Sequence, residues 1–319
     1  MAYTVSGLTT YVETNKDALI KSVVLGAKYG DTIQKLAKQL GVKTKERLNY
    51  LSVDPVLQNG QGCGFSAQGS TVLTDREIET AIFKVNDSWC PDTLLQKFAE
   101  YMVKFGANRN AEDGMPFESE ILSEIEKKIN EKMEEQVWIG DKSNSARTDL
   151  IDGFLTQALG ADSASTIAVS YTAATSAISL YEAVKAVIMK IPEEIIDKAT
   201  VFLSPAVYRS LVFELAEKNM FHFPTDRDGN EIETNDIIFP ATNVRVHKTM
   251  GLKGDKKHIY ASVYENMVYA ADLMNDKEEA RLWFSDDQDL YCLKIKWNAG
   301  VATLYPDEVV VLTSTNDLV

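Results

Sequence analysis

The chain has 319 residues, and its 33 Lys and Arg against 47 Asp and Glu give a formal net charge of 33 − 47 = −14. A hydrophobic fraction of 45% excludes a wholly disordered chain, and no segment approaches the ~20 consecutive apolar residues of a membrane span. The acidic balance argues against a general nucleic-acid binder, although one face of such a protein can still enclose nucleic acid.

The N-terminal region predicts two short helices. Residues 17–29 carry apolar side chains at helical spacing, and Gly30 ends that segment. Asp31 and Thr32 can cap a second helix, which Gly41 would stop. The apolar positions of this second helix are Ile33, Leu36, Ala37 and Leu40. Two short helices cannot form a core of their own, so we expect an arm that lies on other parts of an assembly.

A long β-hairpin follows the arm. Residues 47–57 and 71–86 are strand-like, and the Gly-rich segment 58–70 between them predicts a flexible hairpin tip. A two-stranded hairpin is marginal in water by itself. We therefore predict a projecting arm that packs on a neighbouring subunit.

A long charged helix is the clearest element of the middle region. A helix over 92–105 and a polar loop over 108–114 precede it, and Pro116 suits a first helical turn. The long helix should run to about Ile139, roughly 35 Å, with a winding apolar stripe and charged residues elsewhere, among them Glu126 and Glu134. The stripe is Phe117, Ile121, Ile125, Ile129, Met133 and Val137. The pattern predicts an amphipathic helix across one sheet.

The second half of the chain predicts a small α/β region and then a β-rich end. Residues 141–175 are rich in Ser, Thr, Ala and Asp and mark a boundary. Helices are predicted over 176–190 and from Ser204-Pro205, with a buried strand over 199–203 between them. The strands expected after residue 237 are 244–246, 258–271, 281–284, 290–297 and 309–312.

The motifs for dinucleotide and metal chemistry are weak. Gly60, Gly62 and Gly64 resemble a dinucleotide loop, but a strand follows them where a helix is needed. The segment Asp226–Glu231 resembles a calcium loop with its glycine misplaced, so a weak ion site near Asp226 and Asp228 is the most that it suggests. A plain Asp-Gly turn is the favoured alternative.

Histidine, serine and cysteine residues give no catalytic pattern either. His222, His247 and His258 form no HExxH or H-x-H arrangement, and the favoured interpretation is core or solvated histidines. No Ser lies in G-x-S-x-G. The odd and distant cysteines, Cys63, Cys90 and Cys292, fit a reducing compartment without disulfides. We predict no enzyme activity, no catalytic residue, no cofactor and no metal site.

The order of these parts resembles the major capsid protein of tailed bacteriophages, with the Hong Kong 97-type fold of class α+β. Residues 117–141 look like its spine helix, 149–154 like the segment after it, 199–211 like the strand and helix of its A-domain, and 290–312 like its closing strands. The segment 77–105 resembles capsid proteins of phages that infect Bacteroidetes. The resemblance implies these parts: N-terminal arm 1–45, E-loop hairpin 46–88, first part of the P-domain 89–164 with spine helix 116–139, A-domain 165–265 and closing β strands of both domains 266–319.

The resemblance also implies a function and a set of partners. Hexamers and pentamers would tile an icosahedral shell around double-stranded DNA, with no sequence-specific binding and no membrane, and portal, scaffolding and decoration proteins would join it. We expect assembly in the host bacterial cytoplasm, localisation to the virion, no N-terminal trimming and a separate scaffolding protein. Some members crosslink through Lys side chains, for which Lys84 is a conceivable donor, but we predict no crosslink here.

Two alternatives stay open. An encapsulin-type nanocompartment shell would share the fold and hold enzyme cargo in place of DNA. A soluble α/β enzyme is a different class, and it would be a monomer or dimer with no megadalton species.

Overall fold

The fold is described from a computed structural model. The structure describes residues 12, 16–25, 32–54, 56–57, 68–90, 116–144, 149–171, 179–219, 236–272 and 279–318. The predicted helix over 92–105, most of the Gly-rich tip, His222 and the segment Asp226–Glu231 lie outside these residues. In the described part of the chain, no helix is long and apolar enough to cross a membrane.

A five-stranded sheet forms one side of the molecule, and its central strand is β12 (Leu290–Thr303). The C-terminal half of β12 pairs antiparallel with β10 (Met267–Ala271), and its N-terminal half pairs with β11 (Glu279–Ser285). Its other edge pairs with β4 (Ala81–Trp89), and β1 (Ala37–Leu40) runs parallel to β10. Alternate residues of these strands are buried under α4 (Pro116–Ile139) and α2 (Lys16–Leu25).

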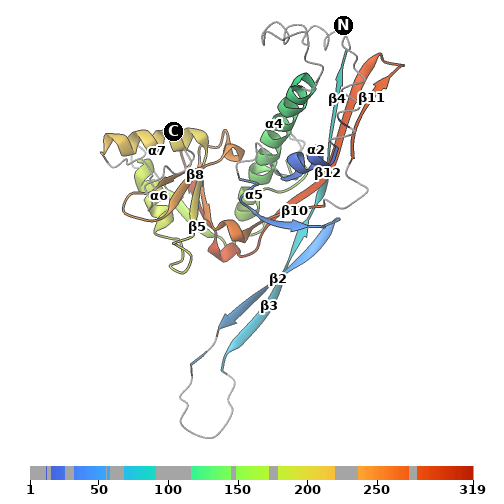
Figure 1. Ribbon diagram of the computed structural model, residues 1–319. Helices are drawn as coiled ribbons and strands as arrows, with labels where there is room; N and C mark the ends of the chain where they lie inside the picture. The colour runs from blue at the N-terminus through green and yellow to red at the C-terminus, as the bar shows by residue number, and fades with distance from the viewer. Residues whose placement is uncertain are drawn as a thin grey trace.

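A six-stranded sheet forms a second lobe on the other side of α4 (Figure 1). Helices α6 (Leu180–Ile188) and α7 (Pro205–Glu217) pack on it and on each other, and their apolar faces share one core with the sheet. The strands, in spatial order, are β5 (Ile167–Tyr171), β13 (Val310–Ser314), β9 (His258–Ser262), β6 (Thr200–Leu203), β8 (Arg245–Lys248) and β7 (Asp236–Ile238).

The C-terminal end of α4 joins the two lobes through Trp138, which is fully buried. The ring centroid of Trp138 lies 4.9 Å from that of Phe202 and 5.3 Å from that of Tyr260, both in the six-stranded sheet. Gly251 packs so closely that a Cβ there would lie 2.0 Å from Cδ1 of Trp138. A side chain at Gly251 would therefore push the two lobes apart.

The hairpin of β2 (Lys45–Asp54) and β3 (Ser70–Glu79) is a separate two-stranded sheet. It projects away from both lobes (Figure 1). Ile78, close to its base, is fully buried, whereas Arg47 and Asn49 further along are exposed. The described part of the hairpin thus touches the body near its base, as the predicted projecting arm requires.

One prediction at the start of the chain needs correction. Residues 32–36 form a turn and Ala37–Leu40 form strand β1, where we predicted a helix over 32–40. The spacing of the apolar residues suits a helix, but parallel pairing with β10 satisfies the backbone in extended form. Gly41 ends the segment at φ +90°, a left-handed conformation that favours glycine.

Three longer segments are divided into elements differently from the prediction. The predicted strand 71–86 breaks at Thr80 into β3 of the hairpin and β4 of the five-stranded sheet. The predicted strand 258–271 breaks at a 3₁₀ turn (Tyr264–Asn266) into β9 and β10, which belong to different sheets. The boundary region 141–175 contains α5 (Phe154–Leu159) and β5.

Candidate assembly surfaces

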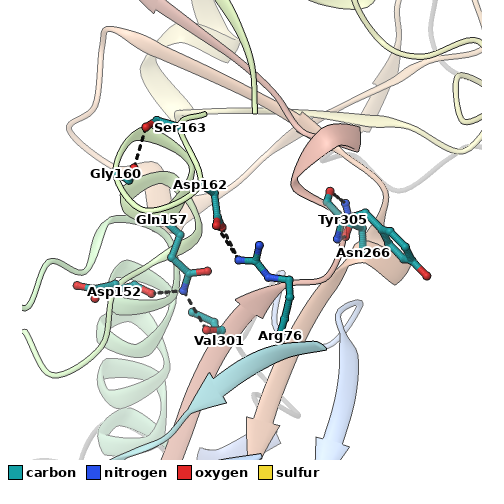
Figure 2. Close-up of polar contacts among 9 residues, drawn as sticks. All are labelled: Arg76, Asp152, Gln157, Gly160, Asp162, Ser163, Asn266, Val301 and Tyr305. Atoms are coloured by element: carbon teal, nitrogen blue, oxygen red, sulfur yellow. Dashed lines mark hydrogen bonds and ion pairs between the residues drawn. The ribbon is translucent and has the colours of Figure 1, made fainter. Parts of the chain in front are cut away.

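The base of the hairpin is held by a largely buried ion pair. Nη2 of Arg76 on β3 donates to both carboxylate oxygens of Asp162, at 2.8 and 2.7 Å, and Asp162 lies in the turn after α5 (Figure 2). The two side chains are only 24% and 10% exposed. Charge-assisted hydrogen bonds of this length are among the stronger polar contacts in proteins. This pair therefore fixes the direction in which the hairpin leaves the body.

Buried amides support the same region. Nε2 of Gln157 donates to the carbonyl oxygens of Asp152 and Val301, at 2.7 and 2.9 Å, and so ties α5 to β12 (Figure 2). Nδ2 of Asn298 donates to the carbonyl of Lys43 at 2.8 Å and to Oγ1 of Thr80 at 3.1 Å. Both chain segments that enter the hairpin are thus bonded to β12.

Gly300 allows the chain to cross the sheet where β3 turns into β4. A Cβ at this position of β12 would lie 2.2 Å from the carbonyl oxygen of Glu79. No other residue has room there, because the nearest atom is backbone that cannot rotate away. The hairpin therefore leaves the body at a point where β12 must have a glycine.

The exposed flank of the hairpin carries alternating charges. Nζ of Lys45 lies 2.6 Å from Glu77, and Arg47 lies 3.0 Å from Asp75 across the two strands. The hydrogen bond from Lys142 lowers the pKa of the Glu79 carboxyl below its ordinary value. Exposed pairs of this kind add little stability, but opposite charges across the strands help to fix their register.

The described segment before the hairpin packs on its own subunit, whereas we expected the N-terminal arm, residues 1–45, to lie on other parts of an assembly. Oγ of Ser22 donates to Glu126 at 2.8 Å, and Oε1 of Glu134 accepts from the backbone N–H groups of Thr32 and Ile33 at 2.8 and 3.0 Å. Glu126 and Glu134 are 6% and 1% exposed, although sequence analysis placed them on the charged side of the helix. Residues 1–11 lie outside the described residues.

The positions of these two glutamates in the helix do fit a buried row. Glu126 and Glu134 lie at a spacing of four with the buried residues Leu122 and Trp138. What the sequence does not reveal is their partners, which lie more than 100 residues away along the chain, and a buried carboxylate is stable only where it accepts hydrogen bonds. The buried side of α4 therefore includes Glu126, Asn130 and Glu134 beside Ile129, Met133 and Val137.

His247 and Asp236 form a buried pair in the six-stranded sheet. Nδ1 of His247 is hydrogen-bonded to Oδ1 of Asp236, and Nζ of Lys35 lies 3.8 Å from the other carboxylate oxygen. Burial alone would raise the pKa of Asp236, but the hydrogen bond and charge of His247, with Lys35 and Arg245, lower it below its ordinary value. The pair links the N-terminal segment to the second lobe.

The other candidate chemical residues that the structure describes are a hydrogen-bonded histidine, a helix-capping serine, two free cysteines and an exposed lysine. His258 lies 3.0 Å from Asp255, and Ser204 caps α7 by accepting from the N–H of Val207. Cys90 and Cys292 are free thiols. Within the described ranges, no group of three or more His, Cys, Asp or Glu residues is arranged to hold a metal ion. Lys84 is exposed on β4, opposite Lys296.

Comparison with known proteins gives structural relatives but no sequence relatives. The sequence matches no protein-family model and no curated protein. A chain of the satellite phage P4 procapsid superposes with a TM-score of 0.63 at 12% identity, covering 97% of this chain and 92% of that one. A chain of Gordonia phage Cozz gives 0.57 at 11% identity, covering 91% and 87%.

A third solved structure belongs to a particle of another kind. A chain of the virus-like particle from Pyrococcus furiosus superposes with a TM-score of 0.52 at 10% identity, covering 95% of this chain and 99% of that one. The fold of this chain is therefore similar to that of chains from two phage particles and one virus-like particle. This chain has the Hong Kong 97-type capsid fold, as its order of elements predicts.

Proposed function

We propose that this chain is the major capsid protein of a tailed phage. Its copies form hexamers and pentamers, which tile an icosahedral shell around a double-stranded DNA genome. The observation that carries this proposal is the likeness to the P4 procapsid chain over 97% of the residues. The projecting hairpin supports it, since a two-stranded sheet whose described contacts with the body lie near its base is suited to bind another copy.

The proposal includes a division of labour along the chain. Residues 1–45 serve as N-terminal arm, 46–88 as E-loop hairpin, 89–164 as the first part of the P-domain, 165–265 as A-domain and 266–319 as closing strands. The role is structural, with no catalytic, cofactor or metal site. Portal, scaffolding and decoration proteins are the expected partners, the shell assembles in the cytoplasm of a bacterial host, and the mature protein is part of the virion.

Many weak contacts can hold such a shell together. Each copy touches several neighbours, so contacts that are modest one by one become strong when the closed surface satisfies all of them at once. The rings that build the shell need heterologous contacts, in which one surface of a copy binds a different surface of the next. A chain with a protruding arm and a separate body offers two such surfaces.

Electron microscopy of the expressed protein tests the proposal directly. We expect closed shells, or at least rings of five and six copies, and a megadalton species in analytical ultracentrifugation. The matched control is a shell sample at high salt, because contacts between charged surfaces weaken with ionic strength. A chain that remains a monomer or dimer at every concentration and salt would contradict the proposal and favour a soluble enzyme.

An encapsulin-type shell is the second candidate, and the likeness to the virus-like particle of Pyrococcus furiosus favours it. Particles isolated from the native source distinguish the two. A phage capsid should protect DNA of uniform length from nuclease and absorb more strongly at 260 than at 280 nm. A nanocompartment should instead contain one abundant enzyme and no protected DNA.

A further inference from the structure

A short segment before the hairpin contacts both lobes of the subunit. Residues 37–40 form β1, which pairs with β10 of the five-stranded sheet. A few residues earlier, Thr32 contacts Thr249 and Lys35 approaches Asp236, and both partners belong to the six-stranded lobe. We call residues 32–40 the strap.

Thr32 attaches the strap at the junction of the lobes. Its Oγ1 lies 2.9 Å from Oγ1 of Thr249 and accepts from Nε1 of Trp138 at 3.3 Å, and its backbone N–H donates to Glu134 at 2.8 Å. Thr249 is bound to β6 in turn, since its N–H donates to the carbonyl of Leu203 at 3.0 Å. Thr32 and Thr249 are fully buried. Thr32 therefore binds α4 and the six-stranded lobe at the same time.

Lys35 attaches the strap a second time, at the edge of the six-stranded sheet. Its Nζ lies 3.8 Å from Oδ2 of Asp236 on the edge strand β7, and the two side chains are 32% and 7% exposed. The chain between Lys35 and Ala37, where β1 begins, can span at most about 7 Å. A rotation of one lobe against the other would therefore break this contact or pull β1 away from β10.

Much of the remaining contact between the lobes is apolar. Phe202 and Tyr260 of the six-stranded sheet share one core with Trp138 of α4 and Phe154 of α5. Hydrophobic contact is non-directional, so it can hold the lobes together over a range of angles. Hydrogen bonds, in contrast, weaken steeply when their distance or direction changes. The strap is therefore suited to select one angle from that range.

We propose that the strap sets the angle between the two lobes and thereby limits the size of the shell; the second half of this inference rests on the proposed shell function. With the strap attached, each copy presents its surfaces to its neighbours at one angle, which favours shells of one size. With the strap detached, several angles are populated, and shells of several sizes can close.

Pulsed electron paramagnetic resonance on unassembled subunits measures the angle without any need for a shell. Spin labels at Asn86→Cys in β4 and Glu217→Cys in α7, both exposed positions, report the distance between the lobes. In the background for this measurement, Ser replaces the three native cysteines, Cys63, Cys90 and Cys292. A wild-type strap should give one narrow distribution of distances.

The strap variant T32V/K35M removes both attachments to the six-stranded lobe and keeps the backbone hydrogen bonds to Glu134. It should widen the distance distribution at least about twofold, because other lobe angles become populated. Its shells should vary in diameter by electron microscopy. Circular dichroism checks that the subunit is folded, and K35M alone serves if the double variant is not.

The control variant K21M/S22A makes the same change in charge and also removes one buried hydroxyl, at Ser22, whose partner is Glu126 on α4. It should keep the narrow distribution and the uniform shells of the wild type. An unchanged distribution in the strap variant, or equal widening in the control, would overturn the role of the strap. Uniform shells from a strap variant with a wide distribution would overturn the link to shell size. A wild-type chain that forms no shell contradicts the proposed function, while the distance measurement still decides what the strap does.

Discussion

Asp236 lies where two neighbouring strands, β7 and β8, meet the distant N-terminal segment. Its carboxylate binds His247 on the neighbouring strand β8 and lies 3.8 Å from Lys35 of the N-terminal segment, and its side chain is only 7% exposed. A buried carboxylate without such partners would be costly, so the three residues depend on one another. A single residue thus couples the docking of the N-terminal segment to the integrity of the second lobe.

Replacing this carboxylate by an amide should reveal the coupling. Asp236→Asn should lower the free energy of unfolding of the unassembled subunit by about 1.5–3 kcal/mol near neutral pH, the range for hydrogen bonds to charged groups. Because the pKa of Asp236 in the folded state is below its ordinary value of 3.8, the stability it contributes is fully present above that pH and is lost as the pH falls further.

Urea unfolding at a series of pH values measures this difference. The gap between the wild type and Asp236→Asn should be present near pH 5 and should close as the pH falls below 3.8. Asp255→Asn is a suitable comparison, since that carboxylate also binds a histidine but at a partly exposed site. If the difference in unfolding free energy persists unchanged in strong acid, the pair is stabilised by packing and not by the charge of Asp236.

At the scale of elements, the hairpin is an independent sheet with a rigid attachment. Gly300 leaves room for the chain to cross β12, and Asn298 donates hydrogen bonds to both segments that enter the hairpin. Arg76 of β3 binds Asp162 in the turn after α5. Each of these contacts lies within the first few residues of the hairpin. Contacts with the body therefore set the direction of the hairpin, and the part beyond its base can bind a neighbouring copy.

A double-mutant cycle should show how much the Arg76–Asp162 pair contributes. We expect a coupling energy of about 1.5–3 kcal/mol between Arg76→Ala and Asp162→Ala, because both side chains are largely buried. The pair Arg47–Asp75 is a matched control on the same hairpin, with side chains 75% and 50% exposed, and its coupling should be below about 1 kcal/mol. Equal coupling energies would mean that the buried pair at the base of the hairpin contributes no more than the exposed pair Arg47–Asp75.

Sequence patterns predicted the elements whose stability is local. The long helix ends where Gly140 follows Ile139, and Ser204 caps α7 as its position before Pro205 indicates. Patterns failed where a distant strand decides the outcome: residues 37–40 have helical spacing but pair with β10, some 230 residues later in the chain. Periodicity describes one face of a segment and carries no information on which partner covers it.

The same reason explains what was missed at the assembly surfaces. The hairpin could be predicted from its two strands and Gly-rich connection, but its base depends on Asp162 and Asn298, which no local pattern marks. The position of Lys84 opposite Lys296 needs the strand register, because the two residues are far apart in sequence and lie opposite each other only through the pairing of β4 with β12. Register is a property of the folded sheet.

At the scale of the whole molecule, two lobes share α4 as a common support and carry the hairpin outside both. Trp138 sits at the junction, between the aromatic side chains Phe154, Phe202 and Tyr260. The core of the subunit is thus complete without the far half of the hairpin. Folding of the subunit and assembly of the shell should therefore respond separately to changes in that arm.

Deleting Asn59–Gly69 tests this separation. The deletion shortens the hairpin beyond its described strands and leaves the Arg76 attachment and both cores intact, so the unfolding free energy of the subunit should change by less than about 0.5 kcal/mol. Shell yield should fall severely, because the removed segment is proposed to contact only neighbouring copies. Thermal unfolding followed by circular dichroism measures the first effect, and sedimentation with electron microscopy measures the second.

A variant in which the same eleven residues are replaced by Gly and Ser separates reach from specific contact. If the hairpin acts only as a spacer, this variant assembles like the wild type; if its side chains bind the neighbour, it fails like the deletion. A deletion variant that forms shells in wild-type yield would contradict the assembly role of the arm. A deletion variant that does not fold would instead show that the hairpin stabilises its own subunit, and the two lobes would not be complete without it.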